Sequence, residues 1–441
     1  MFDMSAGTQM VLLFFVLMFI RLPVAFALGL SALYAMWAMG FGLDLVGDLI
    51  SSGIVKFSLL AIPFFILAGI LMGSVGIAER MIRFFRILVG GLPGGMGVVG
   101  TVVCLFWGAV SGSGPASVAA IGPLIIKGME EDGYSPHFAA GLVCTGAALS
   151  IVIPPSIGLV IYGVIAETSI SELFIAAVVP GLVLGALMLL TLPFASRYAN
   201  QPTSSPSLEA LSPTPDTTLR YFPRLWKSFV SAFWGLMMPV VILGGIYSGV
   251  FTATEAAIVA TVYALLVGVF IYRTLNFKNL YKTLVDAAAS SAVVMLVVAY
   301  ASLFGWVITV DDLIGRASGA LLSFSGNEAV ILLVIMAVLL IAGMFMDAVT
   351  IMYITLPIFL PVARELHWDL VWFGVVVMIN LAIGLFTPPV GINLYVAANI
   401  TRMPLERIAL GAIPFLITSV IGLAIVAAVP ELSSALVNFM K

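Results

Sequence analysis

Long apolar runs alternate with short polar segments along the whole chain, and their lengths predict membrane-crossing helices. About ten runs approach the roughly 20 residues that a helix needs to cross a bilayer. These runs are continuous rather than alternating, which excludes a transmembrane β-barrel. The pattern therefore predicts an all-α polytopic membrane protein, with the lipid bilayer as its solvent.

Two pairs of apolar segments are too short to cross a bilayer alone. In residues 96–127 the arms meet at Ser111-Gly112-Ser113-Gly114-Pro115, and in residues 330–361 they meet at a tip that contains Asp347. Each arm has about 15 residues or fewer, against the roughly 20 that are required. Short apolar arms joined by small and polar residues predict two re-entrant hairpins, each returning to its own side of the membrane.

Two further apolar runs carry a Pro-Pro pair in their middle. Pro154-Pro155 interrupts residues 136–165, and Pro388-Pro389 interrupts residues 370–400. Proline lacks a backbone N–H and its ring clashes with the preceding turn, so nearby carbonyls lose their helical partners. Inside a membrane such carbonyls persist only where protein, water or an ion takes them up. Two broken helices in matching positions of two halves indicate the binding site of a secondary transporter.

The second half of the chain repeats landmarks of the first half. Four prolines lie 234 residues after earlier ones, namely Pro388, Pro389, Pro357 and Pro414 after Pro154, Pro155, Pro123 and Pro180. We therefore expect a first membrane repeat at residues 1–195 and a second at 229–441. The Pro-, Ser- and Thr-rich residues between them, 196–228, are expected to form a cytoplasmic linker.

The distribution of basic residues predicts the orientation of the spans. With the N-terminus placed outside, fourteen of the 18 Lys and Arg residues fall on the inner side. Residues 136–165 then run outward and residues 370–400 run inward, so the repeat is inverted. Both termini are expected on the periplasmic side.

The composition agrees with a membrane protein and excludes several function classes. The chain is 62% hydrophobic and only 9% charged, whereas a soluble domain averages about 25% charged residues. The chain has no basic stripe that would indicate nucleic-acid binding. Its two His residues are too scattered for a metal site. It also has no nucleotide-binding loop of the kind that would predict ATP hydrolysis. Because no His, Cys or carboxylate pair converges in the broken segments, an intramembrane enzyme is disfavoured, and the hairpins suit occlusion better than a channel.

Hairpin tips that face broken helices supply two kinds of binding group. Helix N-termini suit an anion, and unwound carbonyls at helix C-termini suit Na⁺. The expected Na⁺ ligands are Ser111, Gly112, Ser113, Ser150 and Ile153 in the first half and Gly343, Asp347, Thr350, Gly384 and Thr387 in the second. The expected substrate contacts are Ser111, Ser113, Pro155, Ser156, Pro389 and Asn393.

Several of these residues also have a purely structural interpretation. Ser111 and Ser113 are of the type that serves close helix packing. Asp347 would cap a helix or pair with a neighbour, although an intramembrane carboxylate is functional by default. Asn393 would bond a carbonyl that the prolines set free. No Arg or Lys lies in either broken helix, so dipoles, hydroxyls or co-bound cations must meet the negative charge of a substrate.

Five stretches together resemble a known transporter family. They are AIPFFILAG at residues 61–69, VSGSG at 110–114, IPPSI at 153–157, MDAVT at 346–350 and TPPVGINL at 387–394. With these stretches the chain resembles, over essentially its whole length, the large membrane subunit of tripartite ATP-independent periplasmic (TRAP) transporters. It departs from the family's pattern at Gly114-Pro115-Ala116-Ser117. The second half of the chain matches that pattern better than the first half does.

The resemblance implies Na⁺-driven import of a small organic anion, usually a carboxylate of the C4-dicarboxylate kind, across the bacterial inner membrane. It implies a separate periplasmic substrate-binding protein and a small four-helix membrane subunit as partners. It also implies an elevator mechanism, in which hairpins and broken helices move against a scaffold of the remaining spans. The alternative is a self-sufficient Na⁺- or H⁺-coupled anion transporter of the same architecture.

Overall fold

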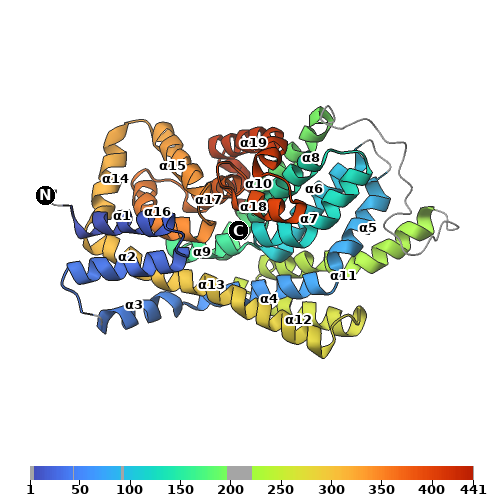
Figure 1. The fold of residues 1–441 in the computed structure, drawn as a ribbon, viewed down its shortest axis with the longest axis horizontal. Helices are drawn as coiled ribbons and strands as arrows, with labels where there is room; N and C mark the ends of the chain where they lie inside the picture. Colours follow the sequence, from blue (N-terminus) through green and yellow to red (C-terminus); the bar gives the residue numbers. More distant parts are fainter. Residues whose placement is uncertain (1–3, 43, 91–93, 196–220, 441) are drawn as a thin grey trace.

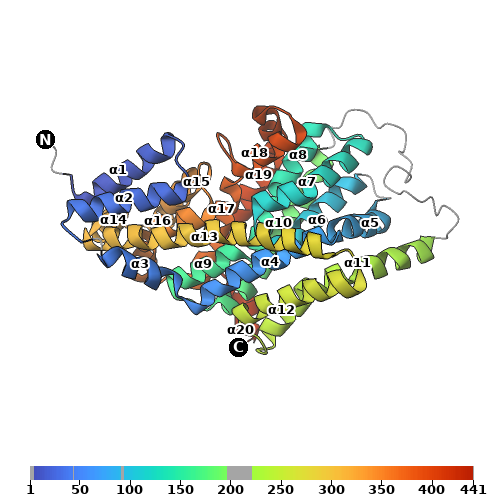
Figure 2. The same cartoon turned by 60° about the horizontal axis from the view of Figure 1, so that its bottom comes forward.

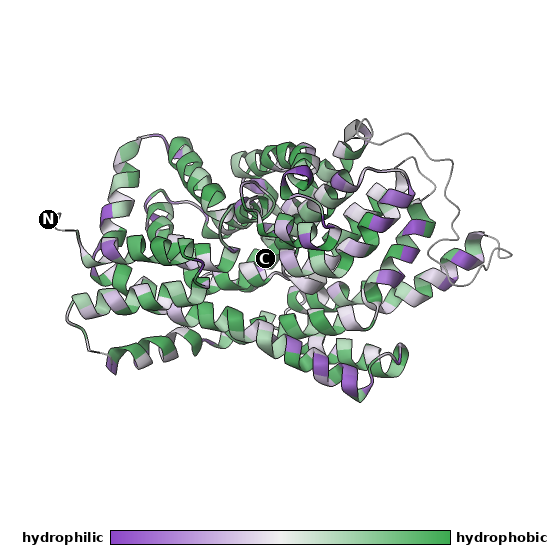
Figure 3. Ribbon diagram, viewed as in Figure 1, coloured by the Kyte–Doolittle hydropathy of each residue, from purple (hydrophilic) through white to green (hydrophobic). Residues whose placement is uncertain are grey.

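The computed structural model describes residues 4–42, 44–90, 94–195 and 221–440. Within these ranges the secondary structure is helical without a β-strand, so the predicted all-α class is confirmed. Eight of the described helices are long and apolar enough to cross a membrane. Most positions along the helices are hydrophobic residues (Figure 3).

Helices α1 to α10 form the first half of the chain. Their bounds are α1 (Ala6–Phe19), α2 (Val24–Ala38), α3 (Asp44–Ile54), α4 (Ala61–Ser74), α5 (Ile77–Val89), α6 (Gly95–Ser111), α7 (Gly114–Glu131), α8 (Pro136–Leu149), α9 (Ile157–Ala166) and α10 (Ile170–Ala195), with short turns η1 (Phe57–Leu60) and η2 (Ser150–Val152). Helices α1 and α2 have 14 and 15 residues. Both are therefore shorter than the roughly 20 residues of a full span.

Helices α11 to α20 form the second half. Their bounds are α11 (Tyr221–Tyr247), α12 (Ala253–Leu266), α13 (Phe277–Val310), α14 (Leu313–Phe324), α15 (Glu328–Gly343), α16 (Ala348–Glu365), α17 (Leu370–Gly384), α18 (Ile392–Thr401), α19 (Leu405–Ala428) and α20 (Glu431–Met440), with a π-helical turn η4 (Val267–Ile271). Helix α11 begins inside the range expected to be linker, so residues 221–228 are helical. The rest of that range, 196–220, lies outside the described residues.

Two helix pairs stand where the sequence predicts hairpins. Helices α6 and α7 are joined through Gly112, which has a left-handed φ of 62°, and Ser113. Helices α15 and α16 are joined by residues 344–347, and Asp347 is the N-cap of α16. The arms of each pair contact one another. The first arms, α6 and α15, have 17 and 16 residues and are short of a full span. The second arms, α7 and α16, have 18 residues each, which is longer than expected, and α16 is among the helices long enough to cross a membrane.

Two helices break at the Pro-Pro pairs. Helix α8 gives way to η2 and then to α9 around Pro154-Pro155, and α17 gives way to α18 around Pro388-Pro389. Both Pro-Pro peptide bonds are cis. Helix α17 is the central element of the fold, because every residue from Trp372 to Phe386 is buried. It packs against α15, α10, α19 and the other broken helix.

Helix α13, with 34 residues, forms a long strut along one side of the molecule (Figures 1 and 2). At roughly 1.5 Å per residue it is about 50 Å long. It contacts α2, α3, α4 and α16. Helix α12 packs in turn against α4. This layer of α2, α4, α12 and α13 supports the hairpins and broken helices.

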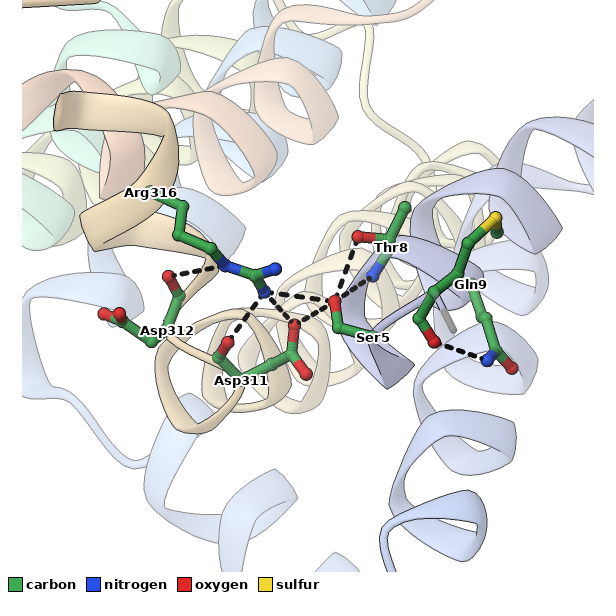
Figure 4. A network of polar contacts seen from close by, with 7 residues as sticks. Ser5, Thr8, Gln9, Asp311, Asp312 and Arg316 are labelled. Atoms are coloured by element: carbon green, nitrogen blue, oxygen red, sulfur yellow. Dashed lines mark hydrogen bonds and ion pairs between the residues drawn. The ribbon is translucent and has the colours of Figure 1, made fainter. Parts of the chain in front are cut away.

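A polar cluster ties the start of the chain to the end of α13 (Figure 4). The Ser5 hydroxyl donates to Asp311 Oδ2 at 2.6 Å, and the Arg316 guanidinium donates to the same oxygen at 2.6 Å. Arg316 also donates to the Asp311 carbonyl at 2.9 Å. Because Ser5 is also the N-cap of α1, the cluster fixes α1 against the junction of α13 and α14.

Candidate anion and cation site between two hairpin tips

Both hairpin tips and both helix breaks border one cavity of about 580 Å³. Helices α4 and α13 form the opposite wall. The lining residues include Gly69 and Gly73 of α4, Trp107, Ser111 to Ala116 of the first hairpin, Ile151, Ile157 and Gly158 at the first break, Ser290 and Val293 of α13, Asp347 to Val349 of the second hairpin, and Met378 and Leu385 of α17. Segments from both halves of the chain therefore converge on one volume.

The first hairpin tip presents a helix start without a side-chain cap. Ser111 Oγ donates to the Ser113 carbonyl at 3.3 Å, and Ser117 Oγ donates to the same carbonyl at 2.8 Å. Ser113 is the N-cap of α7, but its side chain makes no capping hydrogen bond. The first N–H groups of a helix have no intrahelical partner. Because Pro115 has no N–H, the open donors at the start of α7 are the Gly114 and Ala116 N–H groups. Both residues line the cavity, as do Ser111, Gly112 and Ser113.

The predicted residues of the first break lie behind the cavity wall. Ser150 is fully buried, and its hydroxyl donates to the Ala147 carbonyl at 2.7 Å. Ser156 is also fully buried and caps α9 by accepting from the Leu159 N–H at 3.4 Å. Ser150, Ile153, Pro155 and Ser156 are not among the residues that line the cavity. The structure brings them near the first tip but not to the cavity surface.

Asp347 both caps α16 and borders the cavity. Its carboxylate accepts from the Thr350 N–H at 3.1 Å and from the Thr350 hydroxyl at 2.7 Å. Thr350 itself is fully buried. A carboxylate offers about four acceptor positions, so these two bonds leave oxygen lone pairs for a cation. The capping role that the sequence left open is present, and it coexists with a place on the cavity wall.

At the second break the hairpin and the broken helix touch through glycines. A Cβ placed on Gly384 would lie 2.6 Å from the Gly343 Cα, so only residues without a side chain permit this approach. The Gly391 N–H donates to the Met344 carbonyl at 2.9 Å, which ties the break to the hairpin tip. The Thr387 hydroxyl donates to the Ile383 carbonyl at 2.6 Å. Gly343, Gly384, Thr387 and Pro389 lie beside the cavity but do not line it.

Asn393 lies behind the first hairpin tip rather than at the cavity surface. It is fully buried, and its Nδ2 donates to the Cys144 carbonyl of α8 at 2.9 Å. This acceptor is a backbone carbonyl, but it lies within α8 and is not one that the prolines set free. The Cys144 thiol donates to the Asn393 carbonyl at 3.3 Å. Asn393 Oδ1 has no hydrogen-bond partner among the described residues. The side chain therefore ties α18 to α8 and keeps one unused acceptor.

Sequence reasoning missed the wall that faces the tips. Gly69 and Gly73 recur four residues apart on α4, and Ser290 is a hydroxyl within the apolar α13. Both patterns are signals of close approach or of a polar surface inside a membrane. Trp107 carries no such signal, because an aromatic residue in an apolar helix is usually part of the core. Asn380 was also missed; it is fully buried in α17 and donates to the Met336 carbonyl at 2.9 Å.

The charge around the cavity is sparse. Among the described residues that line it, Asp347 is the single charged side chain, and Ser111, Ser113 and Ser290 are the polar ones. In the described ranges, no three or more His, Cys, Asp and Glu side chains are grouped so that they could hold a metal ion. The cavity therefore offers hydroxyls, backbone dipoles and one carboxylate. Such groups suit an organic anion and a hard monovalent cation better than a transition metal.

Comparison with known proteins identifies the family. The profile described as "Tripartite ATP-independent periplasmic transporter, DctM component" matches residues 11–432. The chain is 40% identical to the C4-dicarboxylate TRAP transporter large permease protein DctM of Pseudomonas aeruginosa, with 87% of each chain covered. It is 38% identical to the protein of the same name from Rhodobacter capsulatus, with 96% of this chain and 97% of the relative covered.

A longer relative and a solved structure extend the comparison. The chain is 37% identical to the isethionate TRAP transporter permease protein DctMQ of Oleidesulfovibrio alaskensis, over 94% of this chain but only 63% of the relative's length. The crystal structure of the Alcanivorax borkumensis YdaH transporter matches with a TM-score of 0.66 at 13% identity, covering 97% of this chain and 99% of that one. The similarity to the solved YdaH structure, at 13% identity, concerns the fold alone. By its sequence, the chain belongs to the DctM family of TRAP transporter large permease proteins, which are multi-pass membrane proteins.

Proposed function

We propose that this chain imports a small organic anion coupled to the Na⁺ gradient, as the large membrane subunit of a TRAP transporter in the bacterial inner membrane. The observation that carries the proposal is the convergence of both hairpin tips and both helix breaks on one cavity. The open start of α7 supplies N–H donors for an anion. Asp347 and the carbonyls near the breaks supply oxygen ligands of the kind that Na⁺ prefers.

Names of relatives support an organic anion without fixing which one. They include permeases for C4-dicarboxylate, isethionate, sialic acid and 2,3-diketo-L-gulonate. Because these relatives share 33–40% identity with this chain, one architecture serves chemically different substrates. A C4-dicarboxylate is one candidate among several.

The partners follow from the family. We propose that a periplasmic substrate-binding protein delivers the anion and that a small four-helix membrane subunit completes the transporter. We also propose that the two hairpins and broken helices form an inverted repeat and move as an elevator against the layer of α2, α4, α12 and α13. The residues expected to bind substrate and Na⁺ lie at or beside the cavity, which is compatible with this motion.

Uptake into proteoliposomes tests the proposal. The chain is reconstituted with the small subunit, and uptake of radiolabelled anion is followed with and without binding protein, and with NaCl or choline chloride outside. We expect uptake only when both Na⁺ and the binding protein are present. Full uptake without the binding protein would favour the self-sufficient carrier, and equal uptake in choline would exclude Na⁺ coupling.

A further inference from the structure

One face of α7 leads from the cavity to a charged residue. Ala116 and Ala120 line the cavity, and residues three or four apart lie on the same face of a helix. That face continues through Pro123 to Lys127, and all four residues are exposed. Lys127 therefore lies on the cavity-facing side of α7, eleven residues beyond Ala116, or about 16 Å along the helix.

One face of α13 leads away from the same cavity in the same way. Val297, Val293 and Ser290 line the cavity, and Asp286 continues their spacing of three and four residues. Asp286 is exposed and lies eleven residues before Val297. It therefore belongs to the cavity-facing stripe of α13, at the same distance along its helix as Lys127 along α7.

Helix α5 shows that both stripes run to the same end of the molecule. Its Arg86 pairs with Glu131 and Asp132 at the end of α7, at 3.9 and 3.6 Å. Its Arg80 guanidinium carbon lies 3.9 Å from the centre of the Tyr272 ring, five residues before α13 begins. The end of α7 and the start of α13 are therefore both anchored to this helix of 13 residues. This is the end that the basic residues predict to be cytoplasmic.

The two stripes are not packed together in this structure. Helix α13 packs against α16 of the second hairpin, but it has at most a marginal contact with α7. Neither Lys127 nor Asp286 makes a hydrogen bond or an ion pair with the rest of the described chain. Charged residues within membrane helices face the bundle interior or a water-filled cavity rather than lipid. We therefore treat the stripes as surfaces that continue the cavity.

The charges along the two stripes are complementary in order. One turn further from the cavity, Glu130 follows Lys127 on α7, and Lys282 follows Asp286 on α13. All four residues are exposed. Nearer to the cavity both helices carry small residues, which permit close helix approach. Opposite charges attract more strongly across a partly desolvated gap than in bulk water. The two faces therefore match as the sides of a contact that this structure leaves open.

We infer that the facing stripes of α7 and α13 form the cytoplasmic exit of the cavity, and that the exit closes when Lys127 pairs with Asp286. Glu130 and Lys282 form a second pair at the mouth of the closed exit. The structure shows the open arrangement, in which these charges are apart. This inference rests on the proposed function, because an importer must close its cytoplasmic side while it loads from the periplasm.

Cysteine cross-linking tests the inference on the chain with its small membrane subunit in proteoliposomes. Lys127→Cys is combined with Asp286→Cys, and in the control pair it is combined with Leu284→Cys, because Leu284 is exposed but lies two residues off the stripe. The natural Cys104 and Cys144 are both buried. Copper phenanthroline should join the first pair at least fivefold faster than the control pair, measured as loss of maleimide-reactive thiol. A rate no higher than that of the control pair would overturn the inference.

Charge exchange is the second test. Lys127→Glu or Asp286→Lys alone places like charges across the closed exit, so each should lower Na⁺-driven uptake at least fivefold. The double exchange restores the pair and should return uptake to within twofold of the wild type. Single reversals without effect, or a double exchange no better than the singles, would overturn the inference.

The two readouts separate this inference from the proposed function. The cross-link forms between two helices of the chain and is read without any substrate. Wild-type uptake that is equal in NaCl and in choline chloride would contradict the proposed Na⁺ coupling, whereas a fast cross-link in the same preparation would still support the exit. Na⁺-dependent uptake without the cross-link would contradict the exit alone.

Discussion

Asp347 combines two tasks that usually compete. As the N-cap of α16 it accepts two hydrogen bonds from Thr350, which fixes the carboxylate against its own helix. A carboxylate at a helix N-terminus is also favoured by the helix dipole. Its remaining lone pairs border the cavity. The fixed orientation preorganises these oxygens for a cation.

Substitution of Asp347 by asparagine should separate the two tasks. Asparagine is as good an N-cap as aspartate, so we expect the unfolding temperature to stay nearly unchanged. The loss of the negative charge should lower the apparent Na⁺ affinity of uptake at least tenfold, measured as uptake rate against Na⁺ concentration.

Asp369→Asn is the matched control for this substitution. Asp369 caps α17 by accepting from the Val371 N–H at 2.8 Å, and it does not line the cavity. The same chemical change there should leave the Na⁺ dependence as it is. An unaltered Na⁺ response in Asp347→Asn would remove Asp347 from the coupling role.

Among the elements, one close backbone contact joins the second hairpin to the break in α17. A side chain on Gly384 would meet the backbone of Gly343 at 2.6 Å, and backbone yields less easily than a side chain. The cost of overpacking a well-packed site is about 1–3 kcal/mol. The contact therefore sets the position of the hairpin tip relative to the break.

Gly384→Ala should destabilise the protein by about 1–3 kcal/mol, seen as a lower unfolding temperature in detergent. Gly244→Ala in α11 is the control, because a Cβ there meets nothing within 4 Å. Alanine is favoured over glycine in a helix by about 1 kcal/mol, so the control should be neutral or stabilised. Equal behaviour of the two variants would show that the close approach is unimportant.

Asp132, in the connection between α7 and α8, has a raised pKa. Burial raises the pKa of Asp132, while the nearby Arg86 guanidinium, 3.6 Å away, lowers it less strongly. A pKa raised in the folded state means that protonation favours folding. Stability from this group is therefore present at low pH and is lost as the pH rises through the raised pKa.

Asp132→Asn should remove this pH dependence. Relative to the wild type, the variant should gain stability above the raised pKa, and the gain should shrink as the pH falls toward about 4, the ordinary range of an aspartate. Unfolding temperatures between pH 4 and pH 7 measure the difference. Glu130→Gln, at an exposed position two residues earlier, is the control. A difference that does not vary with pH would contradict the assignment.

The helix breaks and hairpin turns around the site were predictable from the sequence, because prolines and glycines produce them locally. Pro154-Pro155 and Pro388-Pro389 break helices for local reasons, and the polar tip near Ser113 marks a turn between short arms. The wall made by Gly73, Trp107 and Ser290 was not predictable, because its position depends on how α4, α6 and α13 pack. Periodicity shows that a helix is apolar, but it does not show which neighbour the helix meets.

The individual site residues were predicted to different extents. Ser111, Ser113 and Asp347 border the cavity, because a hairpin tip exposes whatever residues form it. Ser150, Ser156 and Thr387 are instead engaged in local hydrogen bonds. Short hydroxyl side chains bond readily to neighbouring backbone, and the sequence does not state which direction they take.

On the scale of the whole molecule, the fold divides into a supporting layer and an inserted pair of hairpins. The layer of α2, α4, α12 and α13 runs the length of the molecule (Figure 2). The cavity lies where this layer meets the tips. A transporter that moves its hairpins against this layer would carry the cavity from one side of the membrane to the other, which is the motion that we propose.

The most direct test of the account asks whether the cavity between the tips binds the anion together with Na⁺. Ser113→Cys places a thiol on the cavity wall, while the natural Cys104 and Cys144 are both buried and should label little in the wild type. Ser323→Cys, exposed on α14, is the control. The rate of labelling by a membrane-impermeant thiol reagent is measured with and without a carboxylate that the uptake assay shows to be transported. We predict that this carboxylate slows labelling of Ser113→Cys at least fivefold in NaCl, not in choline chloride, and leaves Ser323→Cys unaffected; labelling of Ser113→Cys at the same rate with and without the carboxylate in NaCl would contradict the account.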